Sequence, residues 1–412
     1  MIIALVVGAS LAACTTAPST PAISSSAGVG ASAIALPIDL DQIDHLAIGV
    51  LIAPVDGEGS EYRPMIAGAT VAASRFALSG GSIELVNAYD DGTSAGALAA
   101  TQQLLDAGVS ALIIGSSGEH LAAAIDAASL AETAVILPYA QAPSPRAGVW
   151  STAPTVRQTG ETLTGALSHI GANRPLLLAS ADSSLTAWLD PVDRIDPDNP
   201  QAVATTIERL TSLQADAVVI DAPADIMAEL VASLHHDLGD LSVPILVGPA
   251  AVTPLFGEMT TVAGASALPL ISVGVNTDDQ AELASGGAGL AADSFFEALK
   301  LDVDHADCLG LPTQSSCSGT DWADINSHDA VVALVRAAER ARSSKPSDLR
   351  SSLEQLSLDW RDGLAGADLD FHAANTLDDD AIDVLHSTTE DPGERPDDGS
   401  NDDGLFWFAE LG

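Results

Sequence analysis

Basic residues are scarce in this chain. It has 15 Lys and Arg against 57 Asp and Glu, which gives a formal net charge of -42 at pH 7. The only lysines are Lys300 and Lys345. Such a surface repels phosphate backbones, so the composition argues against nucleic acid as a partner. Otherwise the acidity favours solvation and says little about a ligand.

Motifs of catalysis and metal binding are also lacking. The segment GSSGEH (115–120) does not have the spacing of a nucleophile elbow, and no phosphate-binding loop occurs. The histidines, among them His235, His236, His305 and His328, are scattered without the spacing of metal ligands. We therefore expect a protein that is not an enzyme and that needs no cofactor and no metal.

Long apolar runs are absent after the first residues. No later stretch reaches the roughly 18 apolar residues that indicate a membrane helix. With 412 residues and 47% hydrophobic content, the chain is long enough for two domains with packed cores.

The N-terminus closes an uncharged apolar stretch with Leu11-Ala12-Ala13-Cys14. This run resembles the lipobox of bacterial lipoproteins, which implies a signal peptide at 1–13 and a lipid anchor on Cys14. Two acyl chains there would give durable membrane attachment. The alternatives are an ordinary start, or a secretory leader whose cysteine is incidental. No Lys or Arg precedes Arg63, which departs from the basic start of such leaders.

The segment after Cys14 and the other two cysteines fit an exported chain. Residues 14–42 begin with a stretch rich in Ser, Thr and Pro, and we expect them to form a flexible tether. Cys308 and Cys317 lie in the Gly/Pro/Ser-rich stretch ADCLGLPTQSSCSG. With one cysteine acylated, these two are left to form a local disulfide.

Short apolar strands alternate with Ala-rich helices along most of the sequence. The first strands are expected at LAIGVLIAP (46–54), IELVNAYDD (83–91), SALIIGSS (110–117) and AVILPYA (134–140). The alternation restarts after the Pro-rich break at 140–148. This pattern predicts an α/β fold of two Rossmann-like lobes, each a parallel sheet covered by helices on both faces. The aromatic stretch 405–408 predicts a last strand packed against one lobe.

Several segments, read in order, carry a family resemblance. They are IGVLIAP with EYRPMIAGATVAA, LLDAGVSALIIGSSGEHLAAA, AVILPYAQAP, VWSTAPTVRQTG, SHDAVVALVRAAERA and LAGADLDFHAANT. Together they resemble the type I periplasmic-binding-protein family, specifically the branched-chain amino-acid binding lipoproteins of ABC importers. The resemblance implies two lobes joined by three hinge crossovers, with ligand captured in the cleft. Lobe one is then expected at 43–145 plus 270–358, and lobe two at 146–269 plus 359–412.

Ser116 and Ser117 are the first candidate ligand-binding residues. They end a strand and begin a helix, where hydroxyls and free N–H groups suit an anion. The resemblance implies that they hold the α-carboxylate of the ligand, helped by Ala140 and Gln141 on the neighbouring loop. Plain N-capping by serine is the alternative.

Tyr62 and Asp221 complete the candidate site. The resemblance implies an aromatic wall at Tyr62 and an ammonium partner at Asp221, which follows a strand of lobe two as Asp182 does. The alternatives are an ordinary tyrosine at a helix entrance and a solvated loop carboxylate. Lobe two is shortened after Ala181, and Trp188 is the only aromatic residue near that point. The family's amino-acid specificity therefore does not carry over.

The resemblance implies a function as an extracytoplasmic, membrane-anchored solute-binding lipoprotein. Such a protein captures a small polar solute, an amino acid or similar, for an ABC permease, and we expect it to be a monomer. The alternative is a lipoprotein of the same fold that takes no part in transport and acts as a cell-envelope regulator or sensor.

Overall fold

The structure is a computed structural model of the 412-residue chain. It describes residues 34–39, 43, 45–56, 59–179, 183–189, 193–238, 243–277, 279–304, 322–390 and 407–410. The predicted lipidation site at Cys14, the predicted Cys308–Cys317 disulfide and Asp182 lie outside these residues. Within the described ranges, no helix is both long and apolar enough to cross a membrane.

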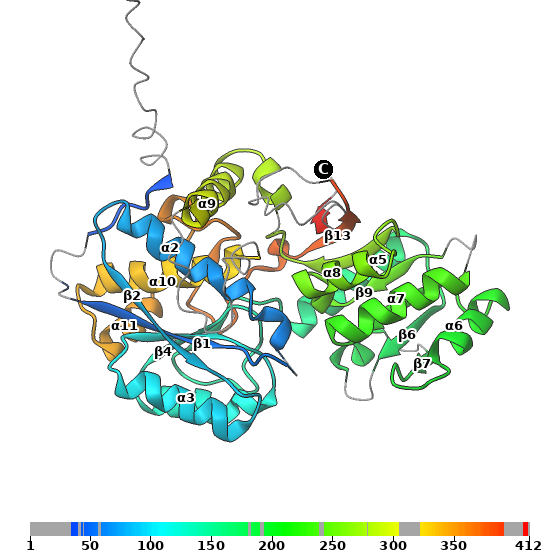
Figure 1. Ribbon diagram of the computed structural model, residues 1–412, viewed down its shortest axis with the longest axis horizontal. Helices are drawn as coiled ribbons and strands as arrows, with labels where there is room; N and C mark the ends of the chain where they lie inside the picture. The colour runs from blue at the N-terminus through cyan, green and yellow to red at the C-terminus, as the bar shows by residue number, and fades with distance from the viewer. Residues whose placement is uncertain are drawn as a thin grey trace, which may run out of the picture.

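Lobe one is built on a five-stranded parallel sheet in the order β2-β1-β3-β4-β5 (Figure 1). The strands are β1 (Leu46–Ile52), β2 (Ile83–Tyr89), β3 (Ala111–Gly115), β4 (Ala134–Leu137) and β5 (Val149–Ser151). One face is covered by α2 (Gly68–Ala77), α10 (Ile325–Ala341) and α11 (Pro346–Leu353), and the other by α3 (Ser94–Asp106) and α4 (Ala122–Leu130). Helix α9 (Gly287–Asp304) packs against α2.

The central strand β1 shows why the sequence folds in this way. All seven of its residues are buried. Ile48 and Val50 pack into the core under α2 and α10, whereas Ala47 and Leu51 pack under α3 and α4. Because alternate side chains of a strand point to opposite faces, a strand covered on both sides must be apolar throughout.

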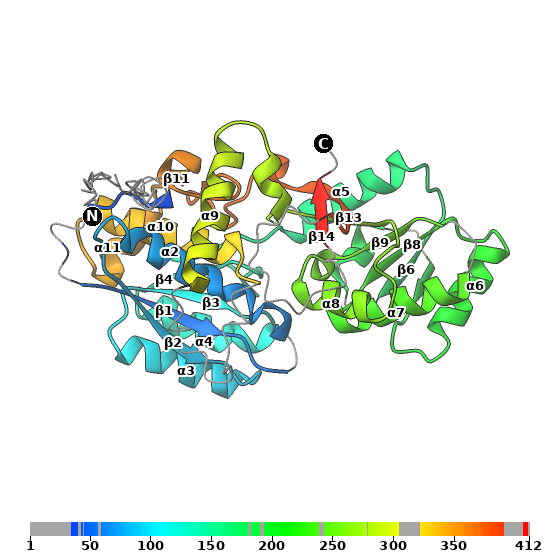
Figure 2. The same cartoon turned by 45° about the horizontal axis from the view of Figure 1, so that its top comes forward.

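Lobe two is built on a seven-stranded sheet in the order β14-β13-β10-β9-β8-β6-β7. Its parallel strands are β6 (Pro175–Ala179), β7 (Asp193–Ile195), β8 (Ala217–Asp221), β9 (Ile245–Val247) and β10 (Leu270–Gly274). Antiparallel β13 (Asp383–Thr388) and β14 (Trp407–Glu410) extend the sheet at the β10 edge (Figure 2). Helices α6 (Ala202–Thr211), α7 (Ala224–Leu238) and α8 (Pro254–Val262) cover one face, and α5 (Val156–His169) covers the other.

The chain passes between the two sheets three times. It crosses from β5 to α5, from β10 to α9, and from the small β11–β12 hairpin (Ser357–Leu358 and Leu369–Asp370) to β13. The first and third crossings are joined by backbone hydrogen bonds, because Ser151 N donates to Ala374 O at 2.8 Å and Thr376 N donates to Ser151 O at 3.0 Å. The predicted α/β fold with two lobes and three crossings is confirmed, as is the last strand.

Three boundaries differ from the sequence expectation. The tether was expected to reach residue 42, but Ile34 and Leu36 are buried in lobe one, at 5% and 4% exposure. These two side chains are large and apolar, unlike the Ser/Thr/Pro stretch before them. Strand β10 was expected to begin the second part of lobe one, whereas it pairs with β9 and β13 in the sheet of lobe two. Strand β5 was expected to begin lobe two, whereas it pairs with β4 at the edge of the sheet of lobe one, so the chain leaves lobe one only after Ser151. The division of the chain into domains otherwise stays a prediction.

Candidate functional site

A cavity lies where the two lobes and the crossings meet. Its volume is about 80 Å³, and we call it the junction cavity. Lobe one, the crossings and lobe two all contribute to its lining, including Tyr62, Tyr139, Asn326, Thr152, Val275 and Thr253. Several of these residues follow the carboxyl ends of parallel strands, which is where ligands bind in open α/β sheets.

Two stacked tyrosines form one wall of the junction cavity. The rings of Tyr62 and Tyr139 lie with their centroids 4.9 Å apart and their planes 6° from parallel. Tyr62 ends the short 3-10 helix η1 (Ser60–Tyr62), and Tyr139 follows β4. Burial raises the pKa of both phenols, so both are neutral hydroxyls at physiological pH.

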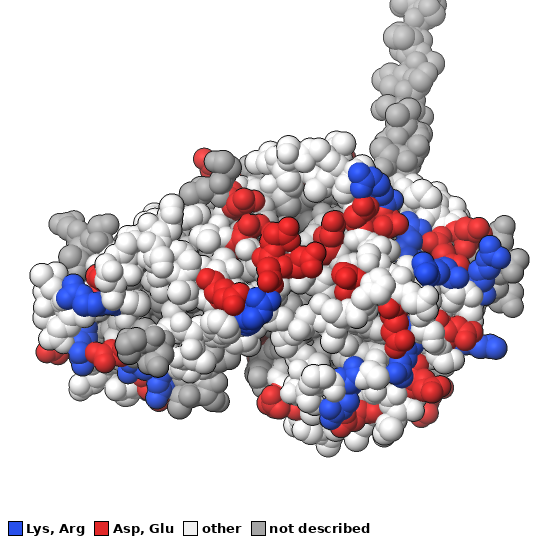
Figure 3. Space-filling view, turned by 180° about the vertical axis from the view of Figure 1, so that it is seen from behind, with Lys and Arg blue, Asp and Glu red and all other residues white. Residues whose placement is uncertain are grey.

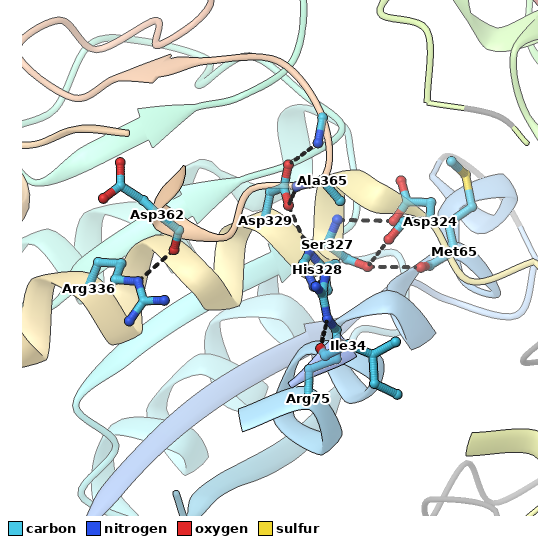
Figure 4. Close-up of polar contacts among 11 residues, drawn as sticks. Ile34, Met65, Arg75, Asp324, Ser327, His328, Asp329, Arg336, Asp362 and Ala365 are labelled. Carbon is cyan, nitrogen blue, oxygen red and sulfur yellow. Dashed lines mark hydrogen bonds and ion pairs between the residues drawn. The ribbon is translucent and has the colours of Figure 1, made fainter. Parts of the chain in front are cut away.

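The hydroxyl of Tyr139 is held by Asp324. It donates to Asp324 Oδ1 at 2.8 Å. The same oxygen accepts from Ser327 N at 3.0 Å, and this bond caps the start of α10 (Figure 4). Ser327 Oγ in turn donates to Met65 O at 3.0 Å. These bonds join α10 both to Tyr139 and to the 3-10 helix η2 (Met65–Ala67).

Asp324 is a buried carboxylate. It is 4% exposed, and its Oδ2 makes no hydrogen bond with the described part of the chain. Burial raises the pKa of Asp324 to about 6, although Ser327, Tyr139 and Asn326 act in the opposite direction as hydrogen-bond donors. Ionising a carboxyl group in this position costs free energy, because the charged form is removed from water.

At the predicted anion site the Ser116 hydroxyl is bonded to a protein group, and the predicted role of Ser116 and Ser117 toward a ligand stays a prediction. Ser116 is fully buried, and its Oγ donates to Asp90 Oδ2 at 3.1 Å. His120 Nε2 lies 2.5 Å from the same oxygen. Gly59, at φ +86°, packs so closely that an added Cβ would lie 2.7 Å from Ser117 N. The Ser116 hydroxyl is therefore engaged inside lobe one, and Gly59 covers the turn.

Ala140 and Gln141 contact the first crossing. Ala140 O accepts from Ser151 Oγ at 2.7 Å, and Gln141 Nε2 donates to Ser151 Oγ at 2.8 Å and to Ala153 O at 2.7 Å. Both residues therefore hold the first crossing in place through hydrogen bonds. Their predicted role toward a ligand stays a prediction.

Asp221 ends β8 in lobe two and accepts a hydrogen bond from Ser183 Oγ. Burial raises the pKa of this carboxyl, against the effect of that hydrogen bond. Asp221 does not line the junction cavity, and neither does Trp188, which packs against Gly160. Of the six predicted ligand residues, only Tyr62 lines it. In the described ranges, no group of three or more His, Cys, Asp or Glu is arranged to hold a metal ion.

Sequence reasoning missed Tyr139, Asp324 and Asn326. Tyr139 and Asp324 are separated by 185 residues, and only the folded chain brings them into contact. A weak signal was present: Asp324 stands three residues before Ser327 at the start of a long helical stretch, as an N-cap aspartate does. That signal predicts a cap but not a wall of a cavity.

Comparisons with known proteins show which fold this is. No protein-family model and no curated protein matches the sequence. Solved structures do match. One is the branched-chain amino acid transporter substrate binding protein LivJ from Streptococcus pneumoniae, in complex with isoleucine. Its TM-score is 0.64 at 16% sequence identity, and the match covers 89% of this chain and 100% of the LivJ chain. A periplasmic binding protein type 1 from Bordetella pertussis has a TM-score of 0.64 at 15% identity, with the same coverage. The fold is that of the type I periplasmic binding proteins.

A third match has a different ligand. The solute binding protein of an ABC transporter from R. palustris, in complex with 4-hydroxybenzoate, has a TM-score of 0.62 at 13% identity and covers 89% of this chain and 96% of its own. The type I binding-protein fold thus serves an aliphatic amino acid in one neighbour and an aromatic acid in another. The ligand is set by the residues of the site and not by the fold.

Behind the junction cavity, lobe one of this type I fold contains a buried polar chain (Figure 4). Arg75 Nη1 lies 2.9 Å from His328 Nε2, and His328 Nδ1 lies 2.7 Å from Asp329 Oδ1. Asp329 also accepts from the backbone N–H groups of Ala365 and Gly366. All three charged or titratable side chains are at most 5% exposed. Because arginine only donates, His328 Nε2 must accept and its Nδ1 must carry the proton.

Proposed function

We propose that this chain is an extracytoplasmic solute-binding protein that captures a small polar solute between its lobes and delivers it to an ABC permease. The observation that carries the proposal is the junction cavity, which is lined by both lobes and by the crossings that connect them. Closing the lobes about those crossings would enclose a solute at the carboxyl ends of both sheets. The named structural neighbours are binding proteins, which supports binding in preference to catalysis.

The proposal includes a lipid anchor on Cys14 and a monomeric receptor. Its support is the lipobox-like run ending at Cys14 and the low-complexity segment that follows. Labelled fatty acid should be incorporated into the wild-type protein and not into Cys14→Ala. Equal labelling of both proteins would remove the anchor from the proposal and would leave solute binding untouched.

A cell-envelope regulator or sensor of the same fold is the second candidate. The volume of the junction cavity favours it, because about 80 Å³ is well below the roughly 300–1,000 Å³ of a ligand pocket. A receptor with open lobes has only part of its pocket formed, and its lobes close when a solute binds. A regulator that binds no solute keeps the same shape when solutes are added.

Thermal unfolding with a panel of small solutes, followed by small-angle scattering, tests the two candidates. A receptor should be stabilised by at least one solute, by roughly 2.7 kcal/mol at 100 times the dissociation constant. The same solute should reduce the radius of gyration as the lobes close. If amino acids, amides, amines, organic acids and nucleosides all leave the melting temperature unchanged, solute capture is wrong and the regulatory candidate is favoured.

A further inference from the structure

The junction cavity is polar on one side but has no positive charge. None of its lining residues is Lys, Arg or His. The cation nearest to it in sequence, Arg63, is directed elsewhere: its Nη1 donates to Ala53 O at 2.5 Å, and its guanidinium lies 5.5 Å from the centre of the Tyr89 ring. A carboxylate in the junction cavity would therefore lack a charged partner among the described residues.

Negative charge does reach the junction cavity, through Tyr139. Its hydroxyl hydrogen points to the Asp324 carboxylate, 2.8 Å away, so the remaining lone pairs of the phenol oxygen can only accept. Hydrogen bonding to an anion polarises the hydroxyl and makes that oxygen a stronger acceptor. The lining residue Tyr139 thus relays the charge of a carboxylate that is itself hidden from water.

Two buried polar atoms near this wall are unsatisfied. Thr152 Oγ1 has no hydrogen-bond partner among the described residues, and its side chain is 4% exposed and lines the junction cavity. Asp324 Oδ2 also has no such partner, and Asp324 lies behind the lining residue Tyr139 without lining the cavity itself. Buried polar atoms without partners cost free energy, and a ligand group that donates hydrogen bonds offsets this cost. An ammonium group has three such donors and no acceptor.

The stacked tyrosines also attract a positively charged group. The rings of Tyr62 and Tyr139 are parallel to within 6°, and both residues line the junction cavity. The face of an aromatic ring carries negative potential and attracts cations. The surface of the whole chain, with a net charge of -42, also raises the local concentration of cations.

We propose that the solute is a cationic amine whose ammonium group enters the junction cavity against Tyr62 and Tyr139, with the buried carboxylate of Asp324 acting on it through the Tyr139 hydroxyl. This inference rests on the proposed function and names the chemical class of its ligand. It also moves the charged end of the ligand away from the Ser116–Ser117 turn, where the Ser116 hydroxyl already donates to Asp90.

Titration calorimetry with three matched probes tests the class of ligand. The probes are n-butylamine, n-butanol and butyrate, which share a four-carbon chain and differ in charge, and putrescine adds a second amine. The measurement is made in about 0.5 M NaCl, where charges on the acidic surface are screened beyond roughly 4 Å while a buried pair is affected much less. We expect the amines to bind and the alcohol and the acid not to bind.

Variants locate the site. Asp324→Asn removes the charge but keeps an acceptor for Tyr139 and a good N-cap, and Tyr139→Phe keeps the ring but removes the relay. Each should weaken amine binding about tenfold or more, which corresponds to 1.4 kcal/mol. The matched control is Asp359→Asn, which changes another N-cap aspartate, at the 3-10 helix η7 (Trp360–Asp362), and should leave affinity unchanged.

The possible failures are distinct. Binding of butyrate or butanol in preference to the amines would overturn the cationic class and leave solute capture standing. Equal amine affinity in wild type and Asp324→Asn, with both proteins folded by circular dichroism, would remove Asp324 from the site. If no solute of the larger panel binds at all, the proposed function itself fails and this inference fails with it.

Discussion

At the scale of single residues, the ionised carboxylate of Asp324 lowers the stability of the unliganded protein. Its pKa is raised to about 6 by burial, so the folded state holds the proton more tightly than the unfolded chain does. The cost of ionising Asp324 therefore appears as pH rises through 3.8 toward 6, and it is complete above that range. A sequence under selection for stability alone would favour Asn at this cap.

Asp324→Asn should accordingly stabilise the unliganded protein at pH 8, by on the order of 1–3 kcal/mol, since one pKa unit corresponds to about 1.4 kcal/mol. The gain should vanish near pH 4, where the wild-type carboxyl is protonated. Urea unfolding of both proteins across this range measures the difference. A variant that is less stable than wild type at pH 8 would mean that the carboxylate is needed by the fold itself.

His328 should make the fold sensitive to acid. Burial lowers the pKa of His328, and the adjacent Arg75 guanidinium lowers it further, although Asp329 counters both. The folded state therefore favours neutral imidazole, and its contribution is present above the unfolded pKa of about 6.5 and is lost as pH falls below it. Wild type should lose more stability than His328→Gln between about pH 7 and pH 5. Equal loss of stability by wild type and His328→Gln over this range would show that His328 does not set the acid sensitivity.

At the scale of elements, the segment at Ile34–Asp39 belongs to lobe one and not to a tether. The Arg75 guanidinium donates to Ile34 O at 2.8 Å, Leu36 N donates to Arg75 O at 3.1 Å, and Arg336 Nη1 donates to Pro37 O at 2.8 Å. The chain is thus held to α2 and α10 before it enters β1. An anchor at Cys14 would act on the body of the protein through this segment.

Leu36→Ala should destabilise the protein by about 2–5 kcal/mol, because it removes a buried leucine from the core under α2 and α10. Leu290→Ala is the matched control, since Leu290 lies on α9 with 68% of its surface exposed. Chemical denaturation of the two variants measures the difference. Equal stability would show that the segment only rests on lobe one without contributing to its core.

The strands and helices of both lobes could be predicted from the sequence because each is encoded locally. The apolar run at 46–54 contains β1, and the run at 83–91 contains β2. The site could not be predicted in this way. Ser116 has the residue type and position of an anion binder, yet its hydroxyl donates to Asp90, 26 residues away. Contacts of this kind depend on how strands and loops pack, and a single sequence does not encode them in any local pattern.

At the scale of the whole molecule, the two lobes also contact each other away from the backbone crossings. The rings of Trp322, just before α10, and Trp407, in β14, lie 5.7 Å apart and link lobe one to lobe two. The back face of the molecule has many acidic and few basic side chains where the lobes join (Figure 3). Asp378, Asp379 and Asp380 belong to the third crossing, and Arg157 pairs with Asp379 there.

This concentration of negative charge should make stability depend on salt. With a net charge of -42, the folded chain repels itself, and expansion on unfolding relieves part of that repulsion. Raising the ionic strength from about 0.01 M to 1 M shortens the screening length from about 30 Å to 3 Å. The melting temperature should therefore rise by several degrees with NaCl, most steeply at low concentration. Sucrose at matched osmolality serves as the control, because it acts without screening charge. A melting temperature that stays flat or falls with NaCl would show that local ion pairs such as Arg157–Asp379 outweigh the self-repulsion of the folded chain.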